Sequence, residues 1–268
     1  MASHSHSQRT RPRRLALLGM ALAWWIGGCL AVVCFAPAQW LAQGIDGLTD
    51  GRMQLLQVRG TVWQGSGQWV LSAGHGSHTA LALPQRVTWQ WQPLWRGGLQ
   101  LSIHAECCSE QPLVWQWQPL LTGWQIKLQA NRSRWPVAWL SGLGAPWNTI
   151  GMQGELRLQH DDMHWSSLTG LAPSDGQAKL TLFEVSSALS PLKPLGSYEL
   201  TLQGGAAPKL QLHTLDAKLQ LSGSGGWRDG RWQFSGEAQA SEGYEQVLGN
   251  LLGVLGQRQG QRAMFQWG

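Results

Sequence analysis

Two histidines four residues apart are the residues best suited to metal chemistry in this 268-residue chain. His160 and His164 have the spacing that places two imidazoles on one face of a helix, where both can bind a metal ion. They lie between Leu158 and Trp165, however, and the Asp pair between them is more typical of a hairpin turn. A metal site also needs a third ligand and supporting partners. We therefore predict a hairpin turn here, with no metal and no cofactor.

The sequence carries no standard signal for nucleophilic catalysis. Residues Gly65 to Gly67 and Gly223 to Gly225 both read Gly-Ser-Gly, which is not the GxSxG nucleophile elbow. Each triplet is followed two residues later by Trp, so we predict tight turns between strands, each with a packed aromatic ring. A Gly-rich phosphate loop with Lys and a zinc-binding spacing of Cys pairs are also missing. We expect a protein that is not an enzyme.

The four cysteines fall into two pairs that do not make a disulfide scaffold. Cys29 and Cys34 lie in an apolar N-terminal segment, where small packing residues are common. Cys107 and Cys108 are adjacent. A disulfide between them would be strained, because adjacent Cα atoms are only about 3.8 Å apart across a trans peptide. Two reduced or separately capped thiols fit the sequence as well.

Tryptophan is the residue in unusual excess, with 18 in the chain. The stretch Val87-Thr-Trp-Gln-Trp-Gln-Pro-Leu94 recurs as Val114-Trp-Gln-Trp-Gln-Pro-Leu120, which indicates successive hairpins side by side in one sheet. Alternate residues of a strand share a face, so each copy presents two Trp on one side. These side chains could line a groove for glycan or lipid, or fill the core of a sheet that has few other bulky residues. The four candidate binding residues are Trp89, Trp91, Trp115 and Trp117.

Apolar residues alternate with polar ones along most of the chain after residue 50, which predicts strands with one buried face. Glycines and prolines separate the strands at intervals typical of a meander of hairpins. Only 13% of the residues are charged and 34 are Gly, a composition that suits an all-β protein outside the cytoplasm. We predict a mainly β fold built on one large, curved antiparallel sheet. Residues 190–196 should be irregular because of their two prolines.

Three short helices interrupt the predicted strands. One begins at Pro37 and should end by Gly44 or Gly47, and a second spans residues 134–142. The third has Ser241 as a plausible N-cap and Gly256 as its stop. It should cover the open face of the sheet or plug its end. Its apolar stripe consists of Tyr244, Val247, Leu248, Leu251, Leu252 and Leu255.

The uncharged segment Leu15–Ala36 is 22 residues long, enough for a helix of roughly 30 Å that spans a bilayer. Four arginines precede it, which places the N-terminus in the cytoplasm. We predict a cytoplasmic tail over 1–14, a transmembrane helix over 15–36 and a β-rich domain over 37–268 across the membrane. A cleaved signal peptide is the rival, since residues 36–38 read Ala-Pro-Ala. The long apolar segment and the central Pro favour the anchor.

The basic balance of the chain comes mainly from this N-terminal tail. The net charge is +5, and four of the 20 Lys and Arg residues precede the apolar segment, where no acidic residue lies. The remaining 16 basic and 15 acidic residues leave a net charge of +1. Because the basic residues form no cluster beyond Arg14, we expect no nucleic-acid partner.

Taken together, several stretches resemble the type II secretion system protein N family over nearly the whole chain. They are Gly60-Thr-Val-Trp-Gln-Gly-Ser-Gly67, Val87-Thr-Trp-Gln-Trp-Gln-Pro93, Ser187-Ala-Leu-Ser-Pro-Leu-Lys-Pro-Leu-Gly-Ser-Tyr198, Thr214-Leu-Asp216, Gly223-Ser-Gly-Gly-Trp227 and Leu251-Leu-Gly-Val-Leu-Gly256. Ala217 departs from the pattern, where Gly is expected, and this puts one turn in doubt.

The resemblance implies a non-catalytic, single-pass protein of the bacterial inner membrane. Its bulk would lie in the periplasm and contact other secretion components, supporting export of folded proteins across the outer membrane of Gram-negative bacteria. The family is also distantly similar to AsmA-like proteins, whose curved sheets form apolar grooves associated with lipid transport. The alternative hypothesis is therefore a periplasmic groove protein that handles lipid or binds glycan.

Overall fold

A computed structural model describes residues 20, 24–28, 31–145 and 147–268. The predicted cytoplasmic tail over 1–14 lies outside these residues, and so does part of the predicted transmembrane helix over 15–36. Residues 24–28 and 31–34 of that segment are helical. Among the helices that the structure describes, none combines the length and apolarity needed to cross a bilayer.

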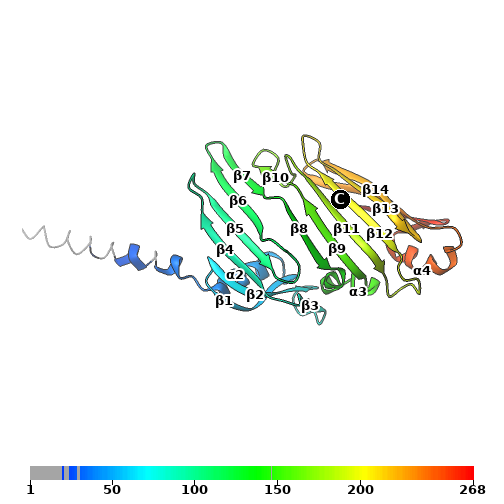
Figure 1. The fold of residues 1–268 in the computed structure, drawn as a ribbon, viewed down its shortest axis with the longest axis horizontal. Helices are drawn as coiled ribbons and strands as arrows, with labels where there is room; N and C mark the ends of the chain where they lie inside the picture. The colour runs from blue at the N-terminus through cyan, green and yellow to red at the C-terminus, as the bar shows by residue number, and fades with distance from the viewer. Residues whose placement is uncertain (1–19, 21–23, 29–30, 146) are drawn as a thin grey trace, which may run out of the picture.

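Two antiparallel sheets, of eight and nine strands, make up most of the described chain (Figure 1). The first contains β1 (Met53–Gly60), β2 (Gln64–Ser72), β3 (Ala80–Ala82), β4 (Val87–Pro93), β5 (Leu99–Ala105), β6 (Leu113–Leu120), β7 (Gly123–Leu128) and β10 (Met163–Ser166). The second contains β8 (Asn131–Pro136), β9 (Gln153–His160), β11 (Gln177–Ser186), β12 (Gly196–Gln203), β13 (Lys209–Ala217), β14 (Leu219–Arg228), β15 (Arg231–Ala240), β16 (Gln257–Gln259) and β17 (Arg262–Trp267).

The mainly β prediction is confirmed, but its single sheet is wrong. Alternation identifies a strand without saying which strand it pairs with, and the chain changes sheet between β7 and β8 and again around β10. The predicted hairpin turn between His160 and His164 is wrong for the same reason. His160 ends β9 in the nine-stranded sheet, whereas His164 lies in β10 at the edge of the eight-stranded sheet. The two Asp residues between them connect the sheets.

The hairpins predicted from the Trp repeat are confirmed. Strands β4, β5, β6 and β7 lie side by side in that order, with Trp91 opposite Leu101 and Leu101 opposite Trp115. The turn that Ala217 put in doubt is also formed. Ala217 ends β13, and the chain reaches β14 through Lys218, whose N–H donates to the Leu195 carbonyl oxygen at 2.8 Å.

The two Gly-Ser-Gly triplets lie inside strands β2 and β14, so the prediction of turns at these positions is wrong. Their glycines make room for rings on the neighbouring strand. A Cβ atom on Gly65 would come within 2.5 Å of the Trp89 ring, and one on Gly223 within 2.6 Å of the Phe234 ring. A Gly in a strand thus marks a close approach here.

The helical segments broadly follow the predictions. α2 (Ala38–Leu48) runs through both glycines expected to stop it, which is consistent with the modest cost of Gly in a helix, about 1 kcal/mol. It ends where the Thr49 hydroxyl donates to the Ile45 carbonyl. The helix predicted over residues 134–142 is wrong for its first three residues, which end strand β8. The segment from Val137 to Leu143 is a 3-10 helix, η1, and α3 (Trp147–Ile150) follows it.

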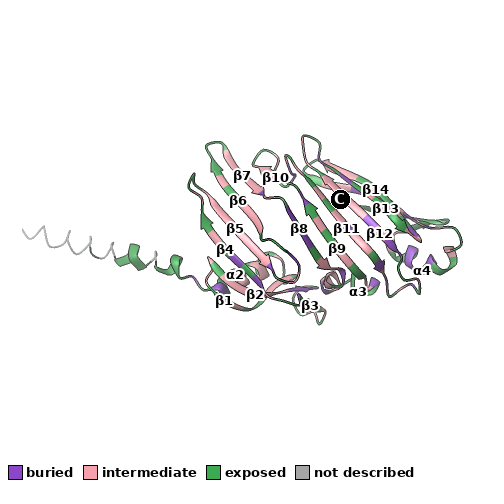
Figure 2. Ribbon diagram, viewed as in Figure 1, coloured by how far each residue is buried: buried purple, intermediate pink, exposed green. Residues whose placement is uncertain are grey.

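The C-terminal helix α4 (Glu245–Leu255) begins after Tyr244, so the predicted N-cap is wrong. The Ser241 hydroxyl instead donates to the Ala217 carbonyl at 3.0 Å and accepts from the Gln220 side-chain amide at 3.2 Å. Gly256 ends the helix as predicted. The leucines of its stripe pack on β14, β15 and β17, and Leu248, Leu251 and Leu252 are completely buried. Buried residues gather beside α4 and along β8 (Figure 2).

Replacing Gly223 by Ala should destabilise the fold, because the added methyl group meets a fixed ring. Phe234 is buried and stacks on Phe265 and Trp267, so it has little room to move. We expect a loss of about 1–3 kcal/mol in the free energy of unfolding, measured by urea denaturation. The matched control is Gly253→Ala, because a Cβ atom there meets open space within α4.

The control should be neutral or stabilising by up to about 1 kcal/mol, since Ala is the better helix former. Equal losses in the two variants would contradict the assigned role of the strand glycine.

Candidate functional site

Aromatic side chains from the two sheets meet on the same side of the molecule. Trp139 of η1 shows this, because it contacts one ring from each sheet. Its ring stacks on Trp135 of β8 at 5.8 Å and meets Trp69 of β2 edge-on at 5.9 Å. The rows of apolar residues therefore form one face, which η1 closes where the sheets meet. Its largest uncovered parts are the Trp-rich rows of the first sheet and the leucine rows of the second.

The four predicted binding tryptophans have different environments. Trp89 is only 5% exposed, and its indole N–H donates to the Val62 carbonyl at 3.0 Å. Trp91 and Trp115 are half-buried in one row, and Trp115 lies 5.7 Å from Trp165. Trp117 is 40% exposed. Trp89 is thus fixed in the core. That the four form a binding face stays a prediction.

The second sheet carries an apolar groove of about 370 Å³ on this face. Strands β9, β11, β12, β13, β14, β15 and β17 form its floor, while η1, α3 and α4 contribute residues at its sides. Most of its floor leucines are half-buried, and within the described residues no second layer of strands or helices covers them completely. Twenty residues line it: Leu140, Trp147, Ile150, Met152, Leu156, Leu180, Leu182, Val185, Ser187, Leu195, Tyr198, Leu200, Leu212, Leu219, Leu221, Phe234, Leu251, Leu255, Phe265 and Trp267.

The two hydroxyl groups in the groove lining are already hydrogen-bonded to the backbone. The Tyr198 hydroxyl donates to the Leu219 carbonyl at 3.0 Å, and burial raises the pKa of this phenol, so it stays neutral. The Ser187 hydroxyl donates to the Ile150 carbonyl at 2.7 Å. The groove therefore offers an occupant mainly hydrocarbon contact.

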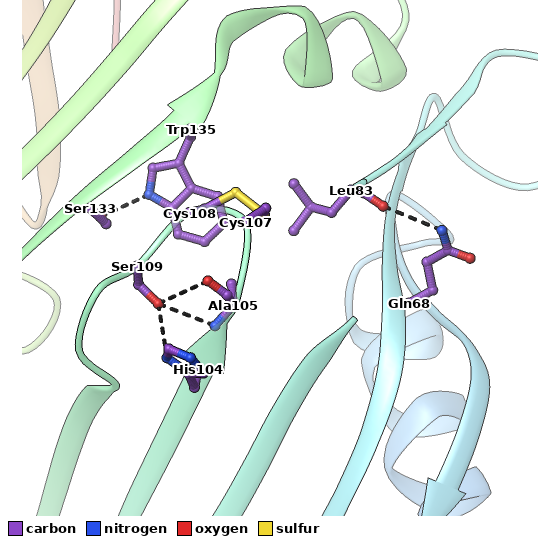
Figure 3. The surroundings of a disulfide bond; sticks show 9 residues. All are labelled: Gln68, Leu83, His104, Ala105, Cys107, Cys108, Ser109, Ser133 and Trp135. Carbon is purple, nitrogen blue, oxygen red and sulfur yellow. Dashed lines mark hydrogen bonds between the residues drawn. A yellow bond between two sulfur atoms is a disulfide. The ribbon is translucent and has the colours of Figure 1, made fainter. Parts of the chain in front are cut away.

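The vicinal cysteines lie at the junction between the sheets (Figure 3). Of the states that the sequence allowed, the structure has the disulfide between Cys107 and Cys108. The Cys108 carbonyl accepts the Arg134 N–H of β8 at 2.7 Å, which ties the β5–β6 turn to the second sheet. Cys108 is buried in a cluster with Leu83, and Trp135 packs against this cluster.

A carboxylate reinforces the same junction. Asp162, in the connection between β9 and β10, pairs with Lys127 of β7 and accepts the Ala130 N–H at 2.8 Å. The hydrogen bond from Lys127, followed by that from Ala130, lowers the pKa of Asp162. Because the folded pKa is depressed, this contact stabilises the fold above the ordinary Asp pKa and weakens as the pH falls below it.

The two histidines do not meet in a common site. His160 is 4% exposed, and its Nδ1 lies 3.0 Å from the Asp161 carbonyl. Its Nε2 is buried and has no hydrogen-bond partner among the residues that the structure describes. His164 is in the other sheet. Within the part of the chain that the structure describes, no three His, Cys, Asp or Glu side chains converge on a point where a metal could bind.

Large apolar side chains protrude at one end of the first sheet. Trp95 in the β4–β5 turn and Leu121 in the β6–β7 turn are fully exposed, and Leu168 and Leu171 after β10 are 93% and 82% exposed. We call these four residues the apolar tips. The hairpin pairings place their turns at the same end of neighbouring strands, opposite α3 and the C-terminal end of α2 (Figure 1).

The β1–β2 turn lies at this end too, and the N-terminal segment is attached to it. The Trp91 N–H donates to the Trp63 carbonyl at 2.7 Å, which places the β1–β2 turn beside β4. The Trp63 indole N–H donates to the Val33 carbonyl at 2.6 Å, and the Val62 N–H donates to the Ala36 carbonyl at 2.8 Å. The first sheet is thus fixed directly to the end of the predicted anchor.

Sequence reasoning missed both the groove and the apolar tips. The groove leucines alternate like any buried strand face, so their pattern could not show that a second layer is missing. The tips did leave a signal. Trp95 and Leu121 directly follow the two copies of the repeat, at positions where turns usually carry polar residues or Gly.

A family model described as "Type II secretion system (T2SS), protein N" matches residues 51–265. The match includes both sheets apart from the last residues of β17. No curated protein and no solved structure matches the chain.

The vicinal disulfide can be tested by alkylation. Iodoacetamide added to the denatured, non-reduced chain should modify Cys34, which is free and exposed, and leave Cys107 and Cys108 unmodified in the peptide mass spectrum. After reduction both should be modified. Alkylation of either one before reduction would show that the disulfide is absent.

Asp162 should titrate at a lower pH than an unperturbed Asp, whose pKa is about 3.9. An NMR titration of the Asp162 side chain measures this directly. Lys127→Met should raise the Asp162 midpoint, because it removes the main cause of the depressed pKa. Lys179→Met, which breaks an ion pair with Glu199 in the other sheet, should leave that midpoint unchanged. An unaltered midpoint in the Lys127 variant would disprove the assigned cause.

Proposed function

We propose that this chain, which belongs to the type II secretion system protein N family, is a non-catalytic accessory component of that system. It would support export of folded periplasmic proteins through contacts of its β-domain with other secretion subunits. The family match carries the proposal, since it spans nearly all of both sheets. A role without catalysis is supported by the groove, whose lining is hydrocarbon and whose two hydroxyls are already bonded to the backbone.

The proposed location is the inner membrane, with the N-terminus in the cytoplasm and the β-domain in the periplasm. The uncharged segment over 15–36 and the arginines before it support this orientation. The contacts of Trp63 and Val62 with Val33 and Ala36 are consistent with a β-domain held close to the end of an anchor.

The apolar tips are the proposed contact surface for secretion subunits. Large, fully exposed apolar side chains are costly to hydrate, and clusters of them mark sites of protein contact. The turns at the same end of the second sheet differ, because the β12–β13 turn carries two glycines and the β14–β15 turn reads Asp-Gly. Contact with a partner would therefore involve mainly the first sheet.

The double variant Trp95→Ser, Leu121→Ser should weaken co-purification with other secretion subunits and reduce export of secreted substrates. It removes the two most exposed large side chains at turns, which carry little of the fold's internal packing. Measurements are the secreted fraction of a substrate enzyme and the subunits recovered by affinity purification. The matched control is Leu48→Ser, 90% exposed at the end of α2 and on the opposite end of the sheet.

Two results would count against these proposals. If complete deletion of the gene left export and the levels of all partner subunits unchanged, the secretion role would be wrong. If deletion abolished export but the double variant behaved like Leu48→Ser, the role would stand and the contact surface would lie elsewhere. If the apolar tips were found in contact with lipid, they would form a membrane-facing surface and not a contact surface for secretion subunits.

A further inference from the structure

We propose that three arginines on the outer face of the second sheet form a docking surface for an extended acidic segment of a partner protein. They are Arg132 and Arg134 of β8 and Arg157 of β9, and we call them the arginine surface. This inference does not depend on the secretion role, because it rests on the pairing and the charge of these strands. The arginine surface includes no residue of the groove or of the apolar tips.

The alternation of side chains places the arginine surface opposite the apolar face. In β8, Trp135 stacks on Trp139 of the apolar face. Arg132 and Arg134 occupy the alternate positions of this strand, so they point the other way, and both are exposed. Arg157 lies directly opposite Arg134 in β9 and is exposed too. Strands β8 and β9 lie side by side in the middle of the molecule (Figure 1), and a partner can reach their outer face.

The direct pairing of Arg134 with Arg157 is unfavourable for the sheet by itself. Like charges directly opposite on neighbouring strands repel each other and destabilise the pairing. Among the residues that the structure describes, Arg157 forms an ion pair, whereas Arg132 and Arg134 form none. Two guanidinium groups therefore lack a counter-charge within the described chain. An anionic partner would supply it.

Arg157 is held in one position at the centre of this surface. Its guanidinium carbon lies 3.9 Å from the centre of the Phe183 ring of β11, and its Nε donates to the Glu155 carboxylate. These contacts restrict the side chain before any partner binds. Less conformational entropy is then lost when its remaining N–H groups bind a carboxylate.

The spacing of the arginines matches an extended polypeptide. Arg132 and Arg134 are two residues apart on one strand, so their Cα atoms lie about 6.6 Å apart. Alternate side chains of an extended partner segment have the same spacing and point the same way. Carboxylates at every second position would each meet one guanidinium, in the planar two-bond geometry that arginine and carboxylate share. We therefore commit to a segment in which Asp or Glu occupies alternate positions.

The surrounding charges limit the direction and the kind of partner. Glu110 and Asp161 line a polar cleft together with Arg132, so the acidic segment would run away from them along β8. A nucleic acid is a poorer occupant, because it binds along a longer basic track. Two carboxylates, Glu155 and Glu199, lie on the same outer face and would interrupt such a track.

Binding of a labelled peptide to the purified full chain tests the inference. The probe is a short fluorescein-labelled peptide in which Glu and Thr alternate, and its binding is measured by fluorescence anisotropy. The double variant Arg132→Gln, Arg134→Gln should bind it about tenfold more weakly, because two charge-assisted contacts are lost. The matched control is Arg228→Gln, Arg231→Gln, which removes the same charge from another directly opposed pair, at the turn that contains Asp229. This control should bind the peptide like the unaltered chain.

A stability measurement separates a binding surface from a structural contact. Arg134→Gln should raise the urea midpoint of unfolding, because it removes the repulsion from Arg157, while it weakens binding of the peptide. A lower midpoint would show that the opposed pair supports the fold, and it would overturn the inference. The rise in stability also excludes misfolding as the cause of weaker binding.

Four further results would overturn the inference. They are equal binding by the surface and control variants, equal binding of a peptide with Gln in place of Glu, tighter binding of single-stranded DNA or of phosphatidylglycerol vesicles than of the peptide, and self-association of the chain that the double variant abolishes. None of these measurements involves a secretion subunit. The secretion role is therefore judged separately, by the deletion experiment.

Discussion

The structure is constrained by an imbalance between apolar sheet surface and the material available to cover it. The strands place most of their apolar residues on one side, and the described chain has only four short helical segments after residue 36 with which to bury that side. α4 covers the strands near the C-terminus, and η1 covers the junction between the sheets. Elsewhere the leucine and tryptophan rows are only half-buried. Because there are so few helical segments for so many strands, part of the apolar face stays uncovered. Exposed apolar surface of this kind favours binding of a partner or ligand.

Holding two sheets side by side requires a joint, and polar and aromatic contacts both contribute to it. The disulfide turn at Cys107 and Cys108 bonds to β8, and Asp162 links the return connection to β7 and Ala130. Trp139 contacts a ring from each sheet. These contacts keep the apolar face on one side. If the joint were broken, the groove and the tryptophan rows could move relative to each other. The position of the disulfide is thus explained by its contacts with β8 and with the cluster around Leu83.

The sequence predicted strands well and their pairing poorly. Alternating leucines located almost every strand, because a half-buried strand has a period of two residues. The same pattern could not separate one sheet from two, since the change of sheet at His160 occurs within three residues that look like a turn. The strand glycines were misassigned for a related reason. Gly65 and Gly223 are needed by rings that lie across the sheet, and the sequence does not show which ring faces which glycine. Trp89 was expected either to bind or to fill the core, and only its hydrogen bond to Val62 and its burial place it in the core.

Two findings about this chain are independent of each other. One is its membership of the secretion family, and the other is the open apolar groove of its second sheet. The tips and the groove lie on different sheets, so contact of the tips with other subunits would leave the groove accessible. A density map of the full chain, isolated from the cell envelope in copolymer particles without added detergent, tests the central claim most directly. The account predicts that the groove above Leu200, Leu212 and Leu221 is not filled by any part of the chain itself. A groove closed by the protein's own side chains, or covered by its own N-terminal segment, would contradict it.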